Sequence, residues 1–213
     1  MTNVFSQLAI PAEVDGRFYG VSFGIVTNNK DPDGLGRVRL KLPWLADDAE
    51  STWARVATPM AGPERGCYFL PEVDDEVLVA FEHGSPEFPY VLGGLWNGKD
   101  KPPVSNSDGK NDVRMIKSRN GNVIRLTDTD GSEQIEIIDK SAKNSIVIST
   151  KDNKITITAD ADVVIQATNG KLQLSGTGVE ITSQADVKIE AKSNLALKSN
   201  AQLNIKGRIV NIN

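Results

Sequence analysis

Cysteine and histidine are almost absent from this chain of 213 residues, which has one of each, Cys67 and His83. One cysteine excludes an internal disulfide and a multi-cysteine metal site. No apolar run reaches the roughly 18 to 20 residues that a bilayer-spanning helix needs, and no basic segment near the start leads into an apolar one. We therefore expect a protein made in a reducing compartment, with no membrane span and no secretion signal.

Aromatic residues and proline are absent from the second half of the chain. All 6 Phe, 3 Tyr and 3 Trp lie at or before Trp96, and all 10 Pro lie at or before Pro103. Residues 1–100 have 8 Lys and Arg against 15 Asp and Glu, whereas residues 101–213 have 16 against 13. This shift predicts two structural units that join near residue 105.

The first half resembles a small β-barrel in its pattern. Five short apolar, β-branched or aromatic runs alternate with segments rich in Pro, Gly, Asn and Asp, and these runs are residues 18–27, 37–42, 53–57, 76–81 and 90–95. Five strands in about 80 residues are typical of an OB-fold. We therefore predict an N-terminal extension at 1–17, an OB-fold domain at 18–98 and a linker at 99–112.

The second half is a repeat of about eight residues, predicted over residues 113–213. An apolar-x-apolar triplet recurs at spacings of 9, 8, 9, 7, 8, 8, 8 and 7 residues, which is typical of short strands in a β-helix. The residues predicted to face the core are Ile146, Ile148, Ile155, Ile157, Val163, Ile165, Leu172, Leu174, Val179, Ile181, Val187, Ile189, Leu195, Leu197, Leu203 and Ile205.

An octad cannot bury its two inward side chains alone, so partners must cover them. One chain could wind as a solenoid with three octads per coil, or three chains could intertwine. The absence of Phe, Tyr and Trp suits a narrow triangular interior. We therefore favour an all-β homotrimer in which an OB-fold barrel precedes an intertwined triple-stranded β-helix.

Several motifs in the first half resemble one known family. They are DPDGLGRV at 31–38, the Pro43–Trp44 pair, WARV at 53–56, FLPEVDDEVLVAF at 69–81 and PYVLGGLWNG at 89–98. This chain is similar to the OB-fold of contractile injection spikes, a family that includes phage baseplate assembly protein V and VgrG. The resemblance implies a non-enzymatic homotrimeric spike, which is pushed through a target envelope when a sheath contracts.

The resemblance also implies partners. Residues 1–17 are too few for fused hub domains, so a separate baseplate hub protein is expected, and any effector cargo lies elsewhere. The chain ends without the His-x-His that some phage spikes use to bind iron. We therefore expect a PAAR-type tip protein to dock on Ile209, Val210, Asn211, Ile212 and Asn213. Assembly is expected in the cytoplasm, followed by incorporation into a phage tail, secretion apparatus or extracellular injection particle.

Other motifs suggest chemistry but favour structural roles. His83 has no G-x-S-x-G elbow beside it and is expected in a turn. The acidic cluster at 72–76 is expected in a solvated loop. Asn29, Asp31, Asp33 and Gly34 resemble the start of an EF-hand, but Leu40 stands where that loop needs glutamate, so a tight turn is predicted. No catalytic residue, cofactor or metal is expected.

Two other functions compete with a structural spike. A nucleic-acid-binding barrel would be basic, whereas this barrel is acidic. Lysines such as Lys188 and Lys198 fit the solvated face of a needle, with attraction to anionic envelopes as the alternative. The chief alternative function is a solenoid polysaccharide-acting enzyme, which needs aromatic residues that the second half lacks.

Overall fold

The computed structural model of the chain describes residues 16–45 and 50–212. The strands in these ranges form β-sheets, and the same ranges contain no α-helix. Residues 1–15 of the predicted extension at 1–17 lie outside the described residues, as does Asn213. The chain divides by its internal contacts into two units, Met1–Asp160 and Ala161–Asn213.

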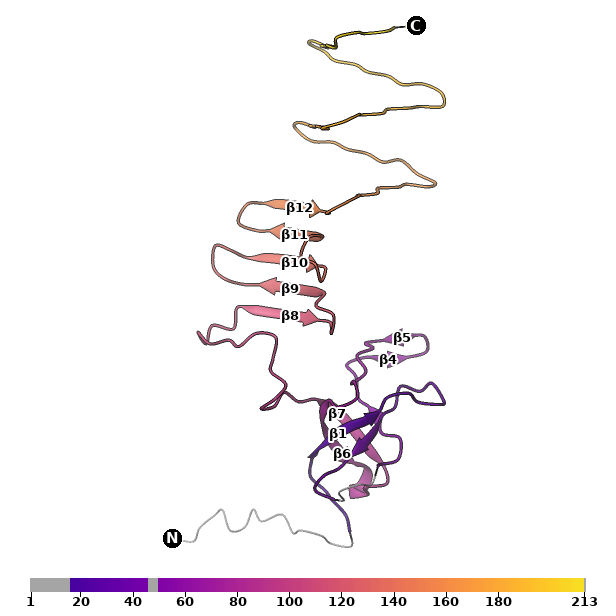
Figure 1. Cartoon of the computed structure of the whole chain (residues 1–213), viewed down its shortest axis with the longest axis vertical. Coiled ribbons are helices and arrows are strands. Elements are labelled where there is room, and N and C mark those ends of the chain that lie inside the picture. The colour runs from indigo at the N-terminus through magenta and orange to yellow at the C-terminus, as the bar shows by residue number, and fades with distance from the viewer. Residues whose placement is uncertain (1–15, 46–49, 213) are drawn as a thin grey trace. The chain divides into compact units, whose positions relative to one another are not determined.

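The first sheet is the predicted barrel. Its strands are β1 (Ser22–Asn28), β2 (Arg39–Lys41), β3 (Arg55–Val56), β6 (Glu76–Phe81) and β7 (Pro89–Gly94), in the order β2-β1-β6-β7-β3 (Figure 1). The ends of this sheet meet because Val38 and Ala54 exchange backbone hydrogen bonds of 3.0 and 2.7 Å. All five strands fall within or overlap the runs predicted from the sequence.

The core of the barrel consists mainly of small β-branched side chains. Val26, Val38, Val77, Val79 and Val91 are fully buried, together with Leu40 and Ala54. One end is covered by aromatic rings: the ring of Phe18 lies 4.5 Å from that of Trp44 and 6.3 Å from that of Phe81. The alternation of buried and half-buried residues along β6 is the pattern of a strand with one face in a core.

A short hairpin interrupts the barrel and was not expected. Strands β4 (Ala61–Gly62) and β5 (Arg65–Gly66) pair across a turn in which Glu64 adopts a positive φ of 54°. Gly66 is required here, because a Cβ atom would lie 2.7 Å from the carbonyl oxygen of Met60. The Pro63–Glu64 pair in this segment was the sequence signal for a turn.

The second sheet is an antiparallel meander within a single chain. Its strands are β8 (Val113–Lys117), β9 (Val123–Thr127), β10 (Gln134–Ile138), β11 (Ser145–Ser149) and β12 (Lys154–Thr158), stacked in sequence order (Figure 1). This differs from the predicted arrangement, in which every strand from residue 113 onward pairs with other chains. The predicted linker, residues 99–112, lies between β7 and β8 and contains no strand.

The spacing of the strands explains this difference. Strands β8 to β12 start 10, 11, 11 and 9 residues apart, which leaves room for a reversing loop after each strand. Each of the four loops contains a residue with positive φ, namely Gly121, Gly131, Ala142 and Asn153. Such residues let a chain turn back on itself, so neighbouring strands pair within the chain.

The octad segment, which we define as residues 161–212, is built differently. No strand ladder forms among its described residues, and none of them has a positive φ. The chain bends at Gly176–Thr177, Gln184–Ala185, Lys192–Ser193, Asn200–Ala201 and Arg208–Ile209, so successive bends start eight residues apart. Figure 1 shows these residues as a zigzag of extended segments. An octad therefore consists of one extended segment and one bend, not a hairpin.

Candidate functional site

One face of the second sheet is almost entirely aliphatic and exposed. Register places Ile116, Ile124, Ile137, Ile146 and Ile157 in one row across the five strands. A second row contains Arg114, Leu126, Ile135, Ile148 and Ile155. We call these two rows the isoleucine face. Its aliphatic side chains are all classed as exposed, which is unusual for nine large apolar residues on one surface.

The opposite face of the same sheet, which we call the polar face, mixes polar side chains with apolar ones such as Met115 and Val147, and it contains an ion pair. Arg125 and Glu136 lie opposite each other in the register, and Arg125 Nε donates to Glu136 Oε2 at 2.6 Å. The Glu136 side chain is only 8% exposed. The ion pair raises the pKa of Arg125. Arg125 and Glu136 thus satisfy each other within the chain, whereas the aliphatic side chains of the isoleucine face lie exposed.

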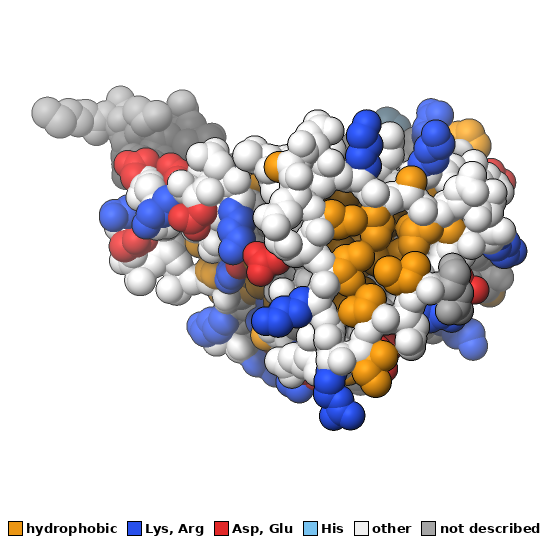
Figure 2. Space-filling view, turned by 90° about the horizontal axis from the view of Figure 1, so that it is seen from above, with side chains coloured by type: hydrophobic (Ala, Val, Ile, Leu, Met, Phe, Trp, Pro, Cys, Tyr) orange, Lys and Arg blue, Asp and Glu red, His pale blue; other side chains and the backbone are white. Residues whose placement is uncertain are grey.

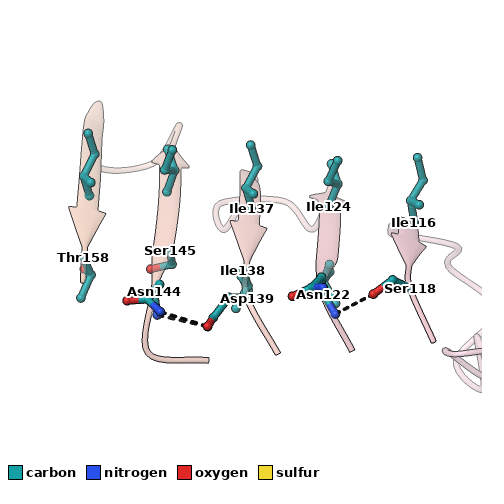
Figure 3. A pocket seen from close by; sticks show the side chains of 13 residues that line it. Ile116, Ser118, Asn122, Ile124, Ile137, Ile138, Asp139, Asn144, Ser145 and Thr158 are labelled. Carbon is teal, nitrogen blue, oxygen red and sulfur yellow. Dashed lines mark hydrogen bonds between the residues drawn. The ribbon is translucent and has the colours of Figure 1, made fainter. Parts of the chain in front are cut away.

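The loops at one end of the strands are hydrogen-bonded to one another. Asn122 Oδ1 accepts a hydrogen bond from the Lys140 backbone N–H, and Asn144 Oδ1 accepts one from the Asp160 backbone N–H, both at 3.0 Å. Asn144 also donates to Asp139, and the Asn122 N–H donates to Ser118 (Figure 3). Beside these polar loops the isoleucine side chains line a shallow groove. These loops are polar and joined by hydrogen bonds, whereas the groove beside them is apolar and open.

The predicted core residues of the needle are exposed in the single chain. They range from 40% exposed at Ile148 to 68% at Ile181. The predicted tip residues Ile209, Val210 and Ile212 are exposed as well. Figure 2 shows apolar side chains gathered together, with Lys and Arg around them. The structure places the first four core residues on the isoleucine face and the other twelve in the octad segment, and their role as a shared core stays a prediction.

The loop at 31–37 is organised around one carboxylate. Asp31 accepts hydrogen bonds from the backbone N–H groups of Asp33, Leu35 and Arg37 and from the Arg37 guanidinium, with Nε at 2.9 Å and Nη2 at 2.7 Å. The Asp31 side chain is 3% exposed. Gly34 and Gly36 both have positive φ, which fits the tight turn predicted here. All of these contacts come from within the loop, so its acidic residues are used for structure.

This loop should make the stability of the barrel depend on pH. The hydrogen bonds from Arg37 hold the pKa of Asp31 well below its ordinary value. A carboxyl group whose pKa is lower in the folded state contributes stability that is present above its unfolded pKa, about 3.9, and is lost as the pH falls through the folded pKa. Asp31→Asn should therefore lower the unfolding temperature at neutral pH and weaken its dependence on pH below about 4.

Asp33→Asn is the matched control for this prediction. Asp33 lies in the same loop and also contacts Arg37, but its side chain is 66% exposed. Exposed ion pairs contribute little, so this substitution should change the unfolding temperature much less. Thermal unfolding followed by circular dichroism between pH 2 and 7 measures both effects. Equal effects of the two substitutions would contradict the role given to Asp31.

The remaining residues considered for chemistry occupy turns. His83 has a φ of 49° in the one-turn 3-10 segment η2 (Glu82–Gly84) between β6 and β7, which is the turn expected for it. In the acidic cluster, Asp75 accepts a hydrogen bond from the Glu72 backbone N–H at 2.8 Å, and Glu76 accepts one from Asn97 at 2.9 Å. His83 and Asp75 thus serve turns, whereas Glu72 accepts a hydrogen bond of 2.7 Å from Arg119, which follows β8.

Among the residues that the structure describes, no three potential metal-ligating side chains converge. Within residues 16–45 and 50–212 there is also no helix that is long and apolar enough to cross a lipid bilayer.

The barrel is the part of the chain for which a known family can be compared directly. Residues 22–96 match the family described as the type VI secretion system/phage-baseplate injector OB domain. This match covers the barrel from β1 to β7. The chain thus carries the OB domain of this injector family, and the resemblance inferred from the motifs at 31–98 is confirmed.

The chain is also similar to three curated proteins, two of which are named as spike proteins. It is 30% identical over 131 residues to the type VI secretion system spike protein VgrG3 of Vibrio cholerae, covering 58% of this chain and 13% of that protein. It is 36% identical over 112 residues to the spike protein VgrG5 of Pseudomonas aeruginosa, covering 48% and 14%. It is 28% identical over 131 residues to the actin cross-linking toxin VgrG1 of V. cholerae, covering 58% and 12%. The matched segments therefore span about an eighth of these relatives.

Proposed function

We propose that the chain is a non-enzymatic structural spike of a contractile injection system or phage tail, and that it acts as a homotrimer. The carrying observation is the exposure of the isoleucine face and of the octad triplets in the single chain. A surface of this size and composition in one chain requires a partner. The injector OB domain and the spike proteins among its relatives support this function.

The octad segment supports a shared core. The described residues of this segment form no hairpin with one another: they have bends but no strand ladder, and none has the positive φ found in the loops of the second sheet. Its neighbours must come from other copies, or from the same chain a full coil later. No ladder of the second kind forms in the described residues. Three intertwined chains would supply one strand per face at each level, spaced about 4.8 Å apart along the needle.

Each part of the chain then has a role in the spike. The three barrels form a collar that rests on a separate hub protein of the baseplate. The needle transmits axial force when the sheath contracts and crosses the target envelope. The last residues, Ile209 to Ile212 and the neighbouring Asn213, hold a PAAR-type tip. Because this chain is proposed to have no catalytic role, effector cargo would be attached through the tip or supplied by another protein.

Quantitative mass spectrometry tests this function. Contractile particles purified from cells that produce the chain should contain three copies for each particle, counted against a baseplate protein of known number. The chain should remain with the particle after sedimentation. Recovery of the chain only outside such particles would contradict a spike function.

The glycines at the corners of the octads provide a stability prediction. Two triplet spacings are shortened to seven residues, and these contain Gly176 and Gly207. A Cβ atom on Gly207 would lie 3.2 Å from the carbonyl oxygen of Ile209, whereas one on Gly170 meets nothing within 4 Å. Gly207→Ala should therefore destabilise the assembled protein by about 1 kcal/mol or more per chain.

Gly170→Ala is the control, and its expected effect has the opposite sign. Alanine restricts the unfolded chain, so this change should be neutral or stabilising by about 0.4–1 kcal/mol. Thermal unfolding of both variants, at equal protein concentration, measures the difference. The corner assignment would be wrong if Gly207→Ala were as stable as Gly170→Ala.

A further inference from the structure

Three asparagines in the chain directly precede a glycine, namely Asn97, Asn120 and Asn169. An asparagine before glycine is the sequence most prone to deamidate without an enzyme. The backbone nitrogen of the next residue attacks the side-chain amide, and glycine has no side chain to hinder its approach. The attack needs an amide group that can rotate and a backbone N–H that is not held elsewhere. The three sites differ in both respects.

The amide group of Asn97 is held at both of its polar atoms. Its Oδ1 accepts hydrogen bonds from the backbone N–H groups of Lys99 at 2.8 Å and Asp100 at 2.7 Å. Its Nδ2 donates to Glu76 Oε2 at 2.9 Å. Rotation of the amide group toward the Gly98 nitrogen would break these bonds, so the fold protects this asparagine.

At Asn120 the attacking nitrogen is held instead. Asn120 and Gly121 lie in the loop that joins β8 to β9, where the Gly121 N–H donates to the Ser118 carbonyl oxygen at 2.9 Å. Ser118 is also bonded to Asn122, at 2.9 Å between backbone groups and at 3.0 Å through the serine hydroxyl. The loop between these two paired strands therefore keeps the Gly121 nitrogen on its carbonyl partner.

Asn169 has neither restraint. It lies in a turn at 168–169, in the corner between the apolar residues Ile165 and Leu172, and it is exposed. Within the described part of the chain, neither the Asn169 side chain nor the Gly170 N–H makes a hydrogen bond of ordinary geometry. The space around Gly170 is open, since a Cβ atom there would meet nothing within 4 Å. The amide group and the nitrogen can therefore approach each other.

We propose that Asn169 is a site of spontaneous deamidation in the folded protein. The Gly170 nitrogen attacks Asn169 Cγ, and the bond from Cγ to the amide nitrogen breaks. The amide nitrogen leaves as ammonia with the proton that the Gly170 nitrogen gives up, and a cyclic imide remains. Water opens this imide at either of its two carbonyl groups and gives aspartate or isoaspartate. Water is the only other reactant.

Both products change the corner between two octads. Each adds a negative charge beside Lys171, and isoaspartate also adds the side-chain methylene to the backbone. That additional atom changes the spacing between the triplets on either side, which are Val163/Ile165 and Leu172/Leu174. Deamidation at this corner is expected whether the octads wind in one chain or pair between copies, because Asn169 lies outside the triplets.

Peptide mapping of the full-length protein by mass spectrometry tests this site. The folded chain is incubated at mildly alkaline pH in water enriched in the heavy oxygen isotope, which labels only the products formed during the incubation. A hydrogen bond that must break first slows a reaction by about tenfold, so Asn169 should be labelled at least about tenfold faster than Asn97 and Asn120. Isoaspartate should accompany aspartate at position 169.

The unfolded chain and one variant are the controls. In denaturant all three sites should be labelled at similar rates, since each is an asparagine before glycine. Gly170→Ala should slow the labelling of Asn169 in the folded protein, because the added methyl group hinders the attacking nitrogen; an unchanged rate would exclude that nitrogen as the nucleophile. Labelling of Asn97 or Asn120 as fast as Asn169 in the folded protein would overturn the proposal, as would an Asn169 that is labelled only in denaturant.

Discussion

Ile189→Asp should prevent assembly of the protein while leaving the barrel folded. In the proposed trimer this position lies in the middle of the needle, and each substitution places a carboxylate in the shared core. Burial can raise the pKa of a carboxyl group by about 3–5 units, and at neutral pH the shift costs at most about 4 kcal/mol per chain, since beyond that the group binds a proton. Three such groups in one assembly should reduce the trimer below detection in sedimentation at micromolar concentration.

Two controls distinguish burial of charge from a general defect. Lys188→Asp alters the adjacent residue, which is expected on the outer face, and should leave the trimer intact. Acidification should partly restore the Ile189→Asp trimer, because the protonated carboxyl group is less costly to bury. A stable Ile189→Asp trimer at neutral pH would show that the inward and outward positions of the octads have been assigned wrongly.

Ile157→Asp should have an effect of similar size at the isoleucine face. Ile157 is 60% exposed in the single chain and belongs to a row of five isoleucines. If three copies bury this face against one another, the carboxylate again costs several kcal/mol per chain. That cost corresponds to a loss of at least about 1000-fold in the assembly equilibrium per chain. Sedimentation equilibrium measures the loss directly.

Thr156→Asp is the matched control, because it alters the same strand on the polar face. Thr156 pairs with Val147 in the register, away from the isoleucine face. The substitution should leave the assembly within about tenfold of the unmodified protein. If Ile157→Asp and Thr156→Asp weakened assembly equally, the isoleucine face would not be the interface.

The barrel could be predicted well from the sequence because its signals are local. Residues 76–81 form a short apolar run between turn formers, and β6 occupies these residues. Turn formers such as Gly34 and Gly36 stand where the chain needs positive φ. The β4–β5 hairpin was missed because its strands have two residues each, too few for any period to appear.

The second half could be predicted in part. The apolar triplets follow from alternation, but the pairing of strands does not. Pairing within one chain at 113–158 was not predicted, because these strands have the same apolar-x-apolar pattern as the octads. The distinguishing signal is the longer spacing of 9–11 residues, together with loop formers such as Asn120–Gly121 and Asp130–Gly131. Partner chains leave no mark on one sequence beyond uncovered apolar positions, which both solenoids and trimers share.

The most direct test of the account is the absolute mass of the purified chain by light scattering, with and without SDS at room temperature. We expect a species of three times 23.0 kDa that persists in the detergent, because chains that share paired strands separate slowly. A single chain of 23.0 kDa without detergent would contradict the shared core, and the octads would then have to wind as a solenoid within one chain.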